Sequence, residues 1–177
     1  MKKARKGFTL VELLIVITIL GTLAAAMSSS TGNATARAKA ASIVANVEAC
    51  KTAAAIFYND HWDDAKVKVK STAEGDETDT NMADTTAAAF LGNFATGYEY
   101  VPNWADFSTG NITFAVKTDG DGSGKGRDNW AITVSFANDA EATNIQKALV
   151  KIKGYSVVVE NKTSFNVNLT TGKITIE

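Results

Sequence analysis

The sequence predicts an α+β protein in which one long N-terminal helix packs on an antiparallel β-sheet, with short additional helices. Residues 8–27 form an almost uninterrupted apolar run, and residues 34–60 carry an apolar stripe at helical spacing. Later segments alternate or are rich in β-branched and aromatic residues, which is typical of strands. The chain has 177 residues, enough for one domain with a sizeable core plus an appendage.

Charge and composition exclude several function classes. Four cations lie in the first six residues, and the rest of the chain has 14 cationic and 19 acidic side chains. A mildly acidic body argues against direct nucleic-acid binding. The single cysteine, Cys50, rules out an internal disulfide, and the single histidine, His61, excludes a multi-histidine zinc site or a Ser/His/Asp triad. Because no catalytic constellation stands out, we expect a protein that is not an enzyme.

The apolar run has the length of a membrane span. From Phe8 to Met27 it has 20 residues, which as a helix extend about 30 Å, the thickness of a bilayer's hydrocarbon core. The basic residues before the run would hold the N-terminus in the cytoplasm. A secretory signal peptide is one interpretation, although the run is long for its apolar region. A plain membrane anchor is the second, and an anchor that is reused in assembly is the third.

Glu12 is the residue that favours the third interpretation. A carboxylate costs about 2.5–3.5 kcal/mol at the centre of a membrane, and less near the boundary where Glu12 lies. The sequence offers no intramembrane partner for it. A cut between Gly7 and Phe8 would create a cationic α-amine on Phe8. Glu12 of one copy would then neutralise the amine of a neighbouring copy, because opposite charges attract strongly in a low dielectric.

The stretch "KGFTLVELLIVITILG", residues 6–21, resembles the class III leader and N-terminal helix of bacterial type IV prepilins and pseudopilins. The family pattern is a short basic leader ending in glycine, then an aromatic residue, and a lone glutamate in fixed register before an apolar stretch. Five residues match it: Gly7, Phe8, Thr9, Leu10 and Glu12. The close resemblance covers residues 2–27, and it also implies a pilin-like version of the predicted fold.

The resemblance implies a processing and assembly route. A prepilin peptidase would cleave after Gly7 and methylate the new amine of Phe8. Phe8 and Glu12 would then be the assembly residues, since Glu12 would pair with the terminal amine of a neighbour. The implied partners are copies of the chain itself, the peptidase, a pilus or type II secretion assembly platform, and the inner membrane before assembly. The precursor would lie in the inner (cytoplasmic) membrane, and the product in an extracellular pilus or a periplasmic pseudopilus.

The function implied first is a structural subunit of a type IV pilus, with surface roles such as adhesion, motility or DNA uptake. The alternative is a pseudopilin of a type II secretion system, which a calcium-like loop and the missing C-terminal disulfide favour. The expected division is a leader at 1–7, a membrane-spanning and filament-core half-helix at 8–33, an amphipathic half-helix at 34–60 and a globular domain at 61–177.

The amphipathic half of the helix should bury one face. Its apolar residues recur at spacings of three and four: Ala36, Ala40, Ile43, Val47, Cys50, Ala54 and Phe57. We expect Cys50 to be a small buried hydrophobe rather than a reactive thiol. Gly21 and the run "MSSSTGN", residues 27–33, are poor helix formers, so a bend or unwound patch is expected between Gly21 and Gly32, with a continuous helix as the alternative.

The elements after the long helix follow from local patterns. The resemblance implies that residues 61–96 are a variable surface connection. Within it the composition predicts an acidic, Thr-rich loop up to residue 84 and a short helix at 85–94 capped by Asp84. A second helix is expected at 138–154, capped by Asn138 or Asp139 and ended by Gly154. The expected strands are 98–101, 111–117, 129–136, 155–161, 164–170 and 173–177, with a turn at Thr171-Gly172 between the last two.

One loop has a metal-like pattern. In "DGDGSG", residues 119–124, Asp119, Asp121 and Ser123 match the opening of an EF-hand calcium loop. The position that should hold a glutamate is Trp130, although Asp128 could substitute. The sequence therefore suggests calcium as the one possible cofactor, and the alternative is a hairpin loop with solvated aspartates.

Overall fold

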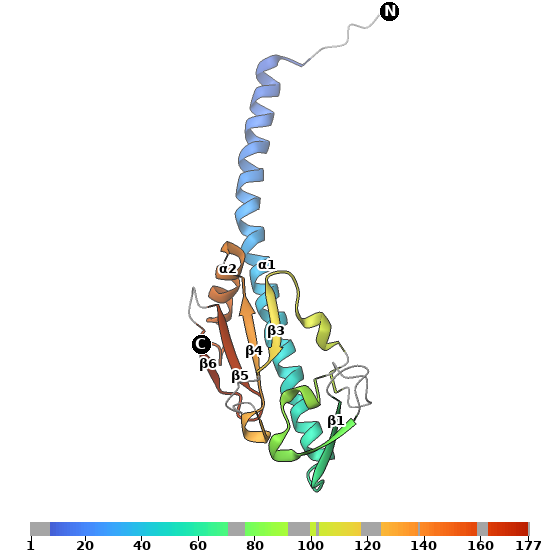
Figure 1. The fold of residues 1–177 in the computed structure, drawn as a ribbon. Coiled ribbons are helices and arrows are strands. Elements are labelled where there is room, and N and C mark those ends of the chain that lie inside the picture. Colours follow the sequence, from blue (N-terminus) through green and yellow to red (C-terminus); the bar gives the residue numbers. More distant parts are fainter. Residues whose placement is uncertain are drawn as a thin grey trace, which may run out of the picture.

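The long helix and the sheet on which it packs are arranged as the sequence predicts, so the α+β, pilin-like fold class is confirmed (Figure 1). The computed structural model describes residues 8–70, 77–91, 100–101, 103–117, 125–137, 139–158 and 163–176. Helix α1 (Leu10–Asp60) projects from the body with its first half and crosses behind the sheet with its second. The sheet is antiparallel in the order β3 (Ile112–Val116), β4 (Ala131–Phe136), β5 (Ser164–Asn168), β6 (Ile174–Ile176).

Helix α1 buries the predicted stripe. All seven stripe residues are buried, and Cys50 and Phe57 are fully so. Asp60 is the last helical residue, and His61 forms the C-cap by donating its backbone N–H to the carbonyl of Phe57. The helix is continuous through residues 21–32, so the unwound patch expected there is wrong for this subunit. A glycine costs only about 1 kcal/mol in a helix, too little to break a cooperative helix of 51 residues.

The central strands place one apolar ladder against α1. Phe114 on β3 pairs with Val134 on β4, which pairs in turn with Phe165 on β5. All three side chains are buried in the core shared with α1. The strands predicted at 111–117, 129–136, 164–170 and 173–177 are therefore confirmed. The first three are each two residues shorter than predicted, and β6 begins one residue later, while residue 177 lies outside the described part.

An aromatic cluster closes the core at the end far from the projecting helix. The ring centroids of Phe57 and Trp130 lie 5.6 Å apart, and Phe90 lies 5.4 Å from Phe57 and 5.0 Å from Trp130. The indole N–H of Trp130 donates to the backbone carbonyl of Thr85 at 3.0 Å. These contacts hold the segment around Thr85 to Phe90 against the sheet and α1.

That segment is not the predicted helix. Only a 3₁₀ turn, η2 (Ala87–Ala89), forms within 85–91, and residues 92–94 lie outside the described part. Asp84 ends an earlier 3₁₀ turn, η1 (Met82–Asp84), instead of capping a helix. The neighbouring side chains of Phe90 and Leu91 are both fully buried. A regular helix turns successive side chains about 100° apart, so the demand for burial has overridden local helix propensity.

A small hairpin replaces part of the predicted loop. Strands β1 (Lys66–Lys70) and β2 (Glu77–Asn81) pair antiparallel, with Val67 opposite Thr80 and Lys68 opposite Asp79. The polar sequence of β2 gives no strand signal, but opposite charges across a pair stabilise it and Val67 is buried. The strand predicted at 98–101 is wrong where it can be seen, because Tyr100 and Val101 form a bend. Residues 98 and 99 lie outside the described residues.

The second helix is shorter than predicted. Helix α2 (Ala140–Leu149) is capped by Asp139, which accepts from the backbone N–H of Ala142 at 2.7 Å. The chain after it forms successive turns, so Gly154 lies beyond the helix end, and the predicted strand 155–161 is wrong over 155–158. Tyr155 and Val158 are both buried, and at a spacing of three a strand would place them on opposite faces. Residues 159–161 lie outside the described part.

Two further 3₁₀ turns lie beside the sheet, η3 (Trp104–Phe107) before β3 and η4 (Arg127–Asn129) before β4. The predicted turn at Thr171-Gly172 is present between β5 and β6, where Gly172 adopts a φ of 70°. The chain therefore returns directly from β5 to the edge strand.

Candidate functional site

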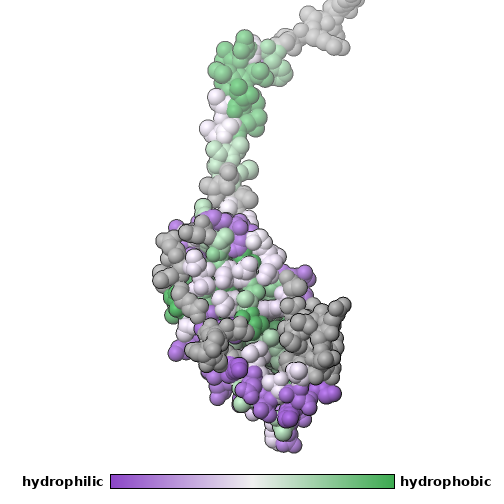
Figure 2. Space-filling model, viewed as in Figure 1, coloured by the Kyte–Doolittle hydropathy of each residue, from purple (hydrophilic) through white to green (hydrophobic). Residues whose placement is uncertain are grey.

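The first half of α1 is an apolar surface that the folded body does not cover. Every residue from Phe8 to Met27 is exposed, and Figure 2 shows this projecting segment as mostly hydrophobic, with a few residues of intermediate hydropathy in its middle. Within the described residues, α1 is the one helix long and apolar enough to cross a bilayer. An exposed apolar surface of this extent requires a membrane or protein partner.

The polar side chains of this segment fit an apolar environment. The hydroxyl of Thr18 donates to the carbonyl of Ile15 at 2.8 Å, and that of Thr22 donates to the carbonyl of Ile19 at 2.9 Å. The backbone is helical from Leu10 onward, so its hydrogen bonds are also made within the segment. Among residues 8–27, only Glu12 is ionisable.

Glu12 lies in a capping box at the start of α1. Its Oε2 accepts from the backbone N–H and from the hydroxyl of Thr9, both at 2.8 Å, and its own backbone N–H donates to the Thr9 hydroxyl at 3.2 Å. The expectation that the chain offers Glu12 no partner is therefore wrong. Thr9 is the functional residue whose capping role the sequence analysis missed. The signal was present, because Thr-x-x-Glu before an apolar run is a capping-box pattern.

The capping box determines where the carboxylate is presented. Both bonds from Thr9 use Oε2, and Oε1 accepts from none of the described residues. Thr9 directly follows Phe8, which is 89% exposed. The carboxylate is thus held within the first turn, beside the position where a cut before Phe8 would create an amine. An oxygen remains available to a cationic group from another chain.

A known protein-family model matches this N-terminal segment of the chain. Residues 2–28 match the family model of the prokaryotic N-terminal methylation motif. The chain carries a class III prepilin leader. This leader is that of type IV pilins and pseudopilins, and Phe8 and Glu12 both lie within the prepilin match. The match ends before α1 enters the folded body, and no solved structure matches the chain.

The other predicted site residues are only partly described. Gly7 and the calcium candidates Asp119, Asp121 and Ser123 lie outside the described residues. Asp128 lies in η4, where its backbone carbonyl accepts from the side-chain amide of Asn168 at 2.6 Å. Across the described ranges, no three His, Cys, Asp or Glu side chains gather as a metal site would require. Calcium binding by the 119–128 loop stays a prediction.

The contacts of Cys50 and His61 are those of residues with a structural role. Cys50 is fully buried, as predicted, and burial raises the pKa of its thiol to about 12. The thiol is therefore neutral at physiological pH and a poor nucleophile. The Nδ1 atom of His61 lies 2.7 Å from the carboxylate of Asp64, just beyond the end of α1. Both residues are remote in sequence from the prepilin segment and belong to the folded body.

Proposed function

We propose that this chain is the structural subunit of a type IV pilus filament. The prepilin leader and the apolar helix support a pilin or pseudopilin precursor that is anchored in a membrane. The pilus assignment is supported most by one observation, the fully exposed apolar half of α1 with Glu12 in its first turn. In this proposal a prepilin peptidase cleaves after Gly7, and the subunit polymerises through its N-terminal helix to serve adhesion, motility or DNA uptake.

The apolar surface serves twice in this route. In the bilayer it faces lipid, and in the filament it faces the same helix of other copies. Head-to-tail contacts that do not close into a ring produce a helical fibre. Small residues let such helices approach closely, and an added Cβ at Gly21 would meet nothing within 4 Å in the isolated subunit. Glu12 pairs with the amine of Phe8 on a neighbouring copy and removes two isolated charges from an apolar interior.

Cleavage is tested at Gly7. In cells with the assembly machinery, Gly7→Leu should leave the leader attached, as measured by the intact mass of the membrane-extracted protein. Gly21→Ala is the control, because this glycine lies in the same matched segment and its surroundings are open. Mature protein that begins at Phe8 despite Gly7→Leu would contradict the cleavage assignment.

Two substitutions at Glu12 distinguish the role of its charge from its role in capping the helix. Glu12→Ala removes both, whereas Glu12→Gln removes the charge but keeps a side chain that completes a capping box. If the carboxylate pairs with a neighbouring amine, both variants are processed normally and both lose most of their filaments, counted by electron microscopy of sheared cells. Normal filament yield from Glu12→Gln would contradict the pairing role and assign Glu12 to the cap.

A type II secretion pseudopilin is the second candidate. The specific observation in its favour is that the only cysteine is buried on α1, so no disulfide can close the C-terminal part of the chain. Deleting the gene separates the two candidates. Loss of long surface fibres supports the pilus, and loss of secreted hydrolases with fibres intact supports the pseudopilus.

A further inference from the structure

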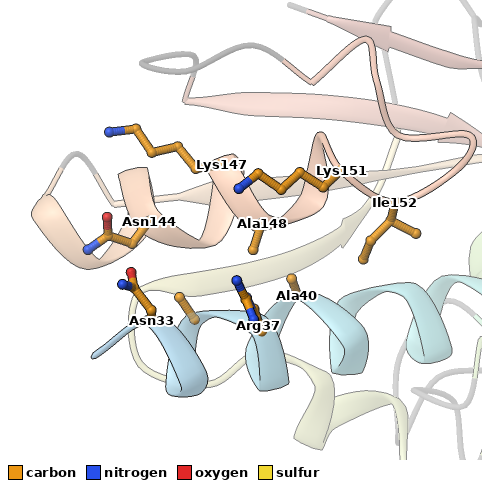
Figure 3. A pocket seen from close by; sticks show the side chains of 9 residues that line it. Asn33, Arg37, Ala40, Asn144, Lys147, Ala148, Lys151 and Ile152 are labelled. Atoms are coloured by element: carbon orange, nitrogen blue, oxygen red, sulfur yellow. The ribbon is translucent and has the colours of Figure 1, made fainter. Parts of the chain in front are cut away.

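A groove lies between α1 and α2 at the end of the body from which the apolar helix projects. It has a volume of about 480 Å³, and α1 and α2 form its two walls (Figure 3). Asn33 and Asn144 lie at one end of the groove, and Arg37 and Lys151 lie between its walls, whereas the side chain of Lys147, which also lines the groove, extends from α2 away from Arg37. The small side chains of alanines on both helices leave the space between them open.

The groove is cationic. Three of its lining side chains carry positive charge and two are amides, and none of the lining residues is acidic. The nearby acid Glu141 is already bound by Lys39 and by the amide of Asn111. Arg37 and Lys151 form no ion pair with any described residue. The chemistry of the groove therefore suits an anion with several acceptor oxygens, such as a phosphate.

The distance between the apolar segment and the groove indicates which phosphate-containing ligand the groove would meet. Asn33 follows Met27, the last residue of the apolar run at 8–27, by six residues, or roughly 9 Å of helix. The headgroup layer on each side of a bilayer is about 5–8 Å thick. Side chains on a helix lean toward its N-terminus, so the guanidinium of Arg37 reaches back toward the membrane. With residues 8–27 in the bilayer, the groove begins beside the headgroups.

We propose that this groove binds the phosphate of an anionic phospholipid headgroup while the subunit is anchored in the membrane. The inference rests on the membrane anchoring in the proposed function. Headgroup binding holds the folded body against the bilayer surface and fixes its orientation before the subunit leaves the membrane. It also makes extraction sensitive to lipid charge, because the groove must release its headgroup when the subunit joins a filament.

The test uses the full chain in a nonionic detergent, titrated with phosphatidylglycerol or phosphatidylcholine and measured by native mass spectrometry. We expect tighter binding of phosphatidylglycerol. Each basic residue near a membrane surface contributes about 1 kcal/mol, so Arg37→Gln with Lys151→Gln should weaken this binding roughly tenfold or more. Inorganic phosphate is titrated in parallel, and it should bind far more weakly because it lacks the acyl chains that hold a lipid in the micelle.

The matched control is Lys66→Gln with Lys173→Gln. It removes the same number of charges at sites away from the groove. Lys66 lies on β1, which follows the C-terminal end of α1, and Lys173 is next to Gly172. A Cβ added at Gly172 would lie 3.4 Å from Nζ of Lys51, a residue 14 positions after Arg37 on α1. The control should keep the lipid preference. Melting temperatures of all variants show whether each is folded.

Three outcomes overturn the proposal: equal binding of the two lipids, equal losses in the groove and control variants, or phosphate binding as tight as lipid binding. If the groove variant keeps its lipid preference but forms no filaments, the groove contacts a second copy instead, which also overturns it. Flotation with lipid vesicles separates this failure from that of the anchor, because a chain without an anchor would not float at all.

Discussion

Trp130 joins three parts of the fold through one side chain. Its ring packs on Phe57 of α1 and on Phe90, and its indole N–H donates to Thr85. The same carbonyl of Thr85 also accepts from the backbone N–H of Gly126 at 2.6 Å. The indole N–H of Trp130, a buried polar group in an aromatic cluster, therefore has a hydrogen-bond acceptor.

Trp130→Phe should lower the free energy of unfolding by about 2 kcal/mol or more, because a buried hydrogen bond is lost and a cavity remains. Urea unfolding of the full chain in detergent measures it. Trp62→Phe is the matched control, since Trp62 is 71% exposed and should change stability by less than about 0.5 kcal/mol. Equal effects of the two substitutions would refute the structural role of Trp130.

Cys50 and Tyr155 make stability depend on alkaline pH. Burial raises the pKa of the Cys50 thiol from 9.0 to about 12. Burial, followed by the negative charge of Glu48, raises the pKa of Tyr155 from 10.0 to about 12. The folded protein therefore keeps protons that the unfolded chain releases. Their contribution to stability is complete below pH 9 and is lost as the pH rises toward 12.

We expect the free energy of unfolding to fall above pH 9 by up to about 1.4 kcal/mol per pH unit for each retained proton. Urea unfolding between pH 8 and 11 measures the slope, and Cys50→Ala should make it shallower. At pH 8, iodoacetamide should alkylate Cys50 only after unfolding. Alkylation of the folded protein would show that the thiol is accessible.

At the scale of elements, α1 is one helix with two environments. Residues 10–27 of the helix are exposed on all sides, while its C-terminal half buries a single stripe against the sheet. Helix propensity does not distinguish the halves, but side-chain polarity does. The capping box at Thr9 and Glu12 starts the helix within the apolar half, so the assembly residues and the helix start coincide.

The turn before β4 depends on a glycine. Gly126 has a φ of 73°, and an added Cβ would lie 3.0 Å from the carbonyl oxygen of Ala83. Gly110 has a similar φ of 57° but open surroundings, so it serves as the control. Both Gly→Ala changes strain the backbone through the positive φ, and the cost is larger at Gly126, because its ψ of 159° places it in a region essentially restricted to glycine.

Gly126→Ala should therefore destabilise more than Gly110→Ala, because only the former also displaces the segment around Ala83. Thermal unfolding followed by near-ultraviolet circular dichroism compares them. Equal melting temperatures would mean that the contact with Ala83 carries no energy.

At the scale of the whole molecule, folding and membrane insertion use separate parts of the chain. The buried core begins at Ala36, and no residue from 8 to 27 belongs to it. The aromatic cluster includes Phe57, near the C-terminal end of α1, whereas the apolar segment forms the N-terminal end of the same helix. Stability should therefore reside almost wholly in residues after 33.

A chain that begins at Asn33 should unfold cooperatively, within a few degrees of the melting temperature of the full chain in detergent. Asn33 is also a good N-cap for the shortened helix. Differential scanning calorimetry of both forms provides the measurement. A large loss of stability on truncation would show that the apolar half supports the folded body.

The sequence by itself determined the features that depend on local periodicity and short motifs. These are the apolar run, the buried stripe from Ala36 to Phe57, the central strands and the prepilin leader with Phe8 and Glu12. Thr9 could also have been assigned from its spacing to Glu12. Each of these follows from residues only a few positions apart, because helix and strand geometry bring such residues together without help from the rest of the chain.

Only the tertiary structure decided the elements whose energy comes from distant partners. The predicted helix at 85–91 and the predicted strand at 155–158 do not form, because other conformations bury the apolar side chains of these segments in the core. The polar strand β2 forms because it pairs with β1. Arg37 and Lys151 both line the cationic groove, although they are far apart in the sequence and no local pattern predicts that they lie close together. The physical reason is that burial and charge pairing depend on distances in space, which the chain acquires only once α1 and α2 have packed.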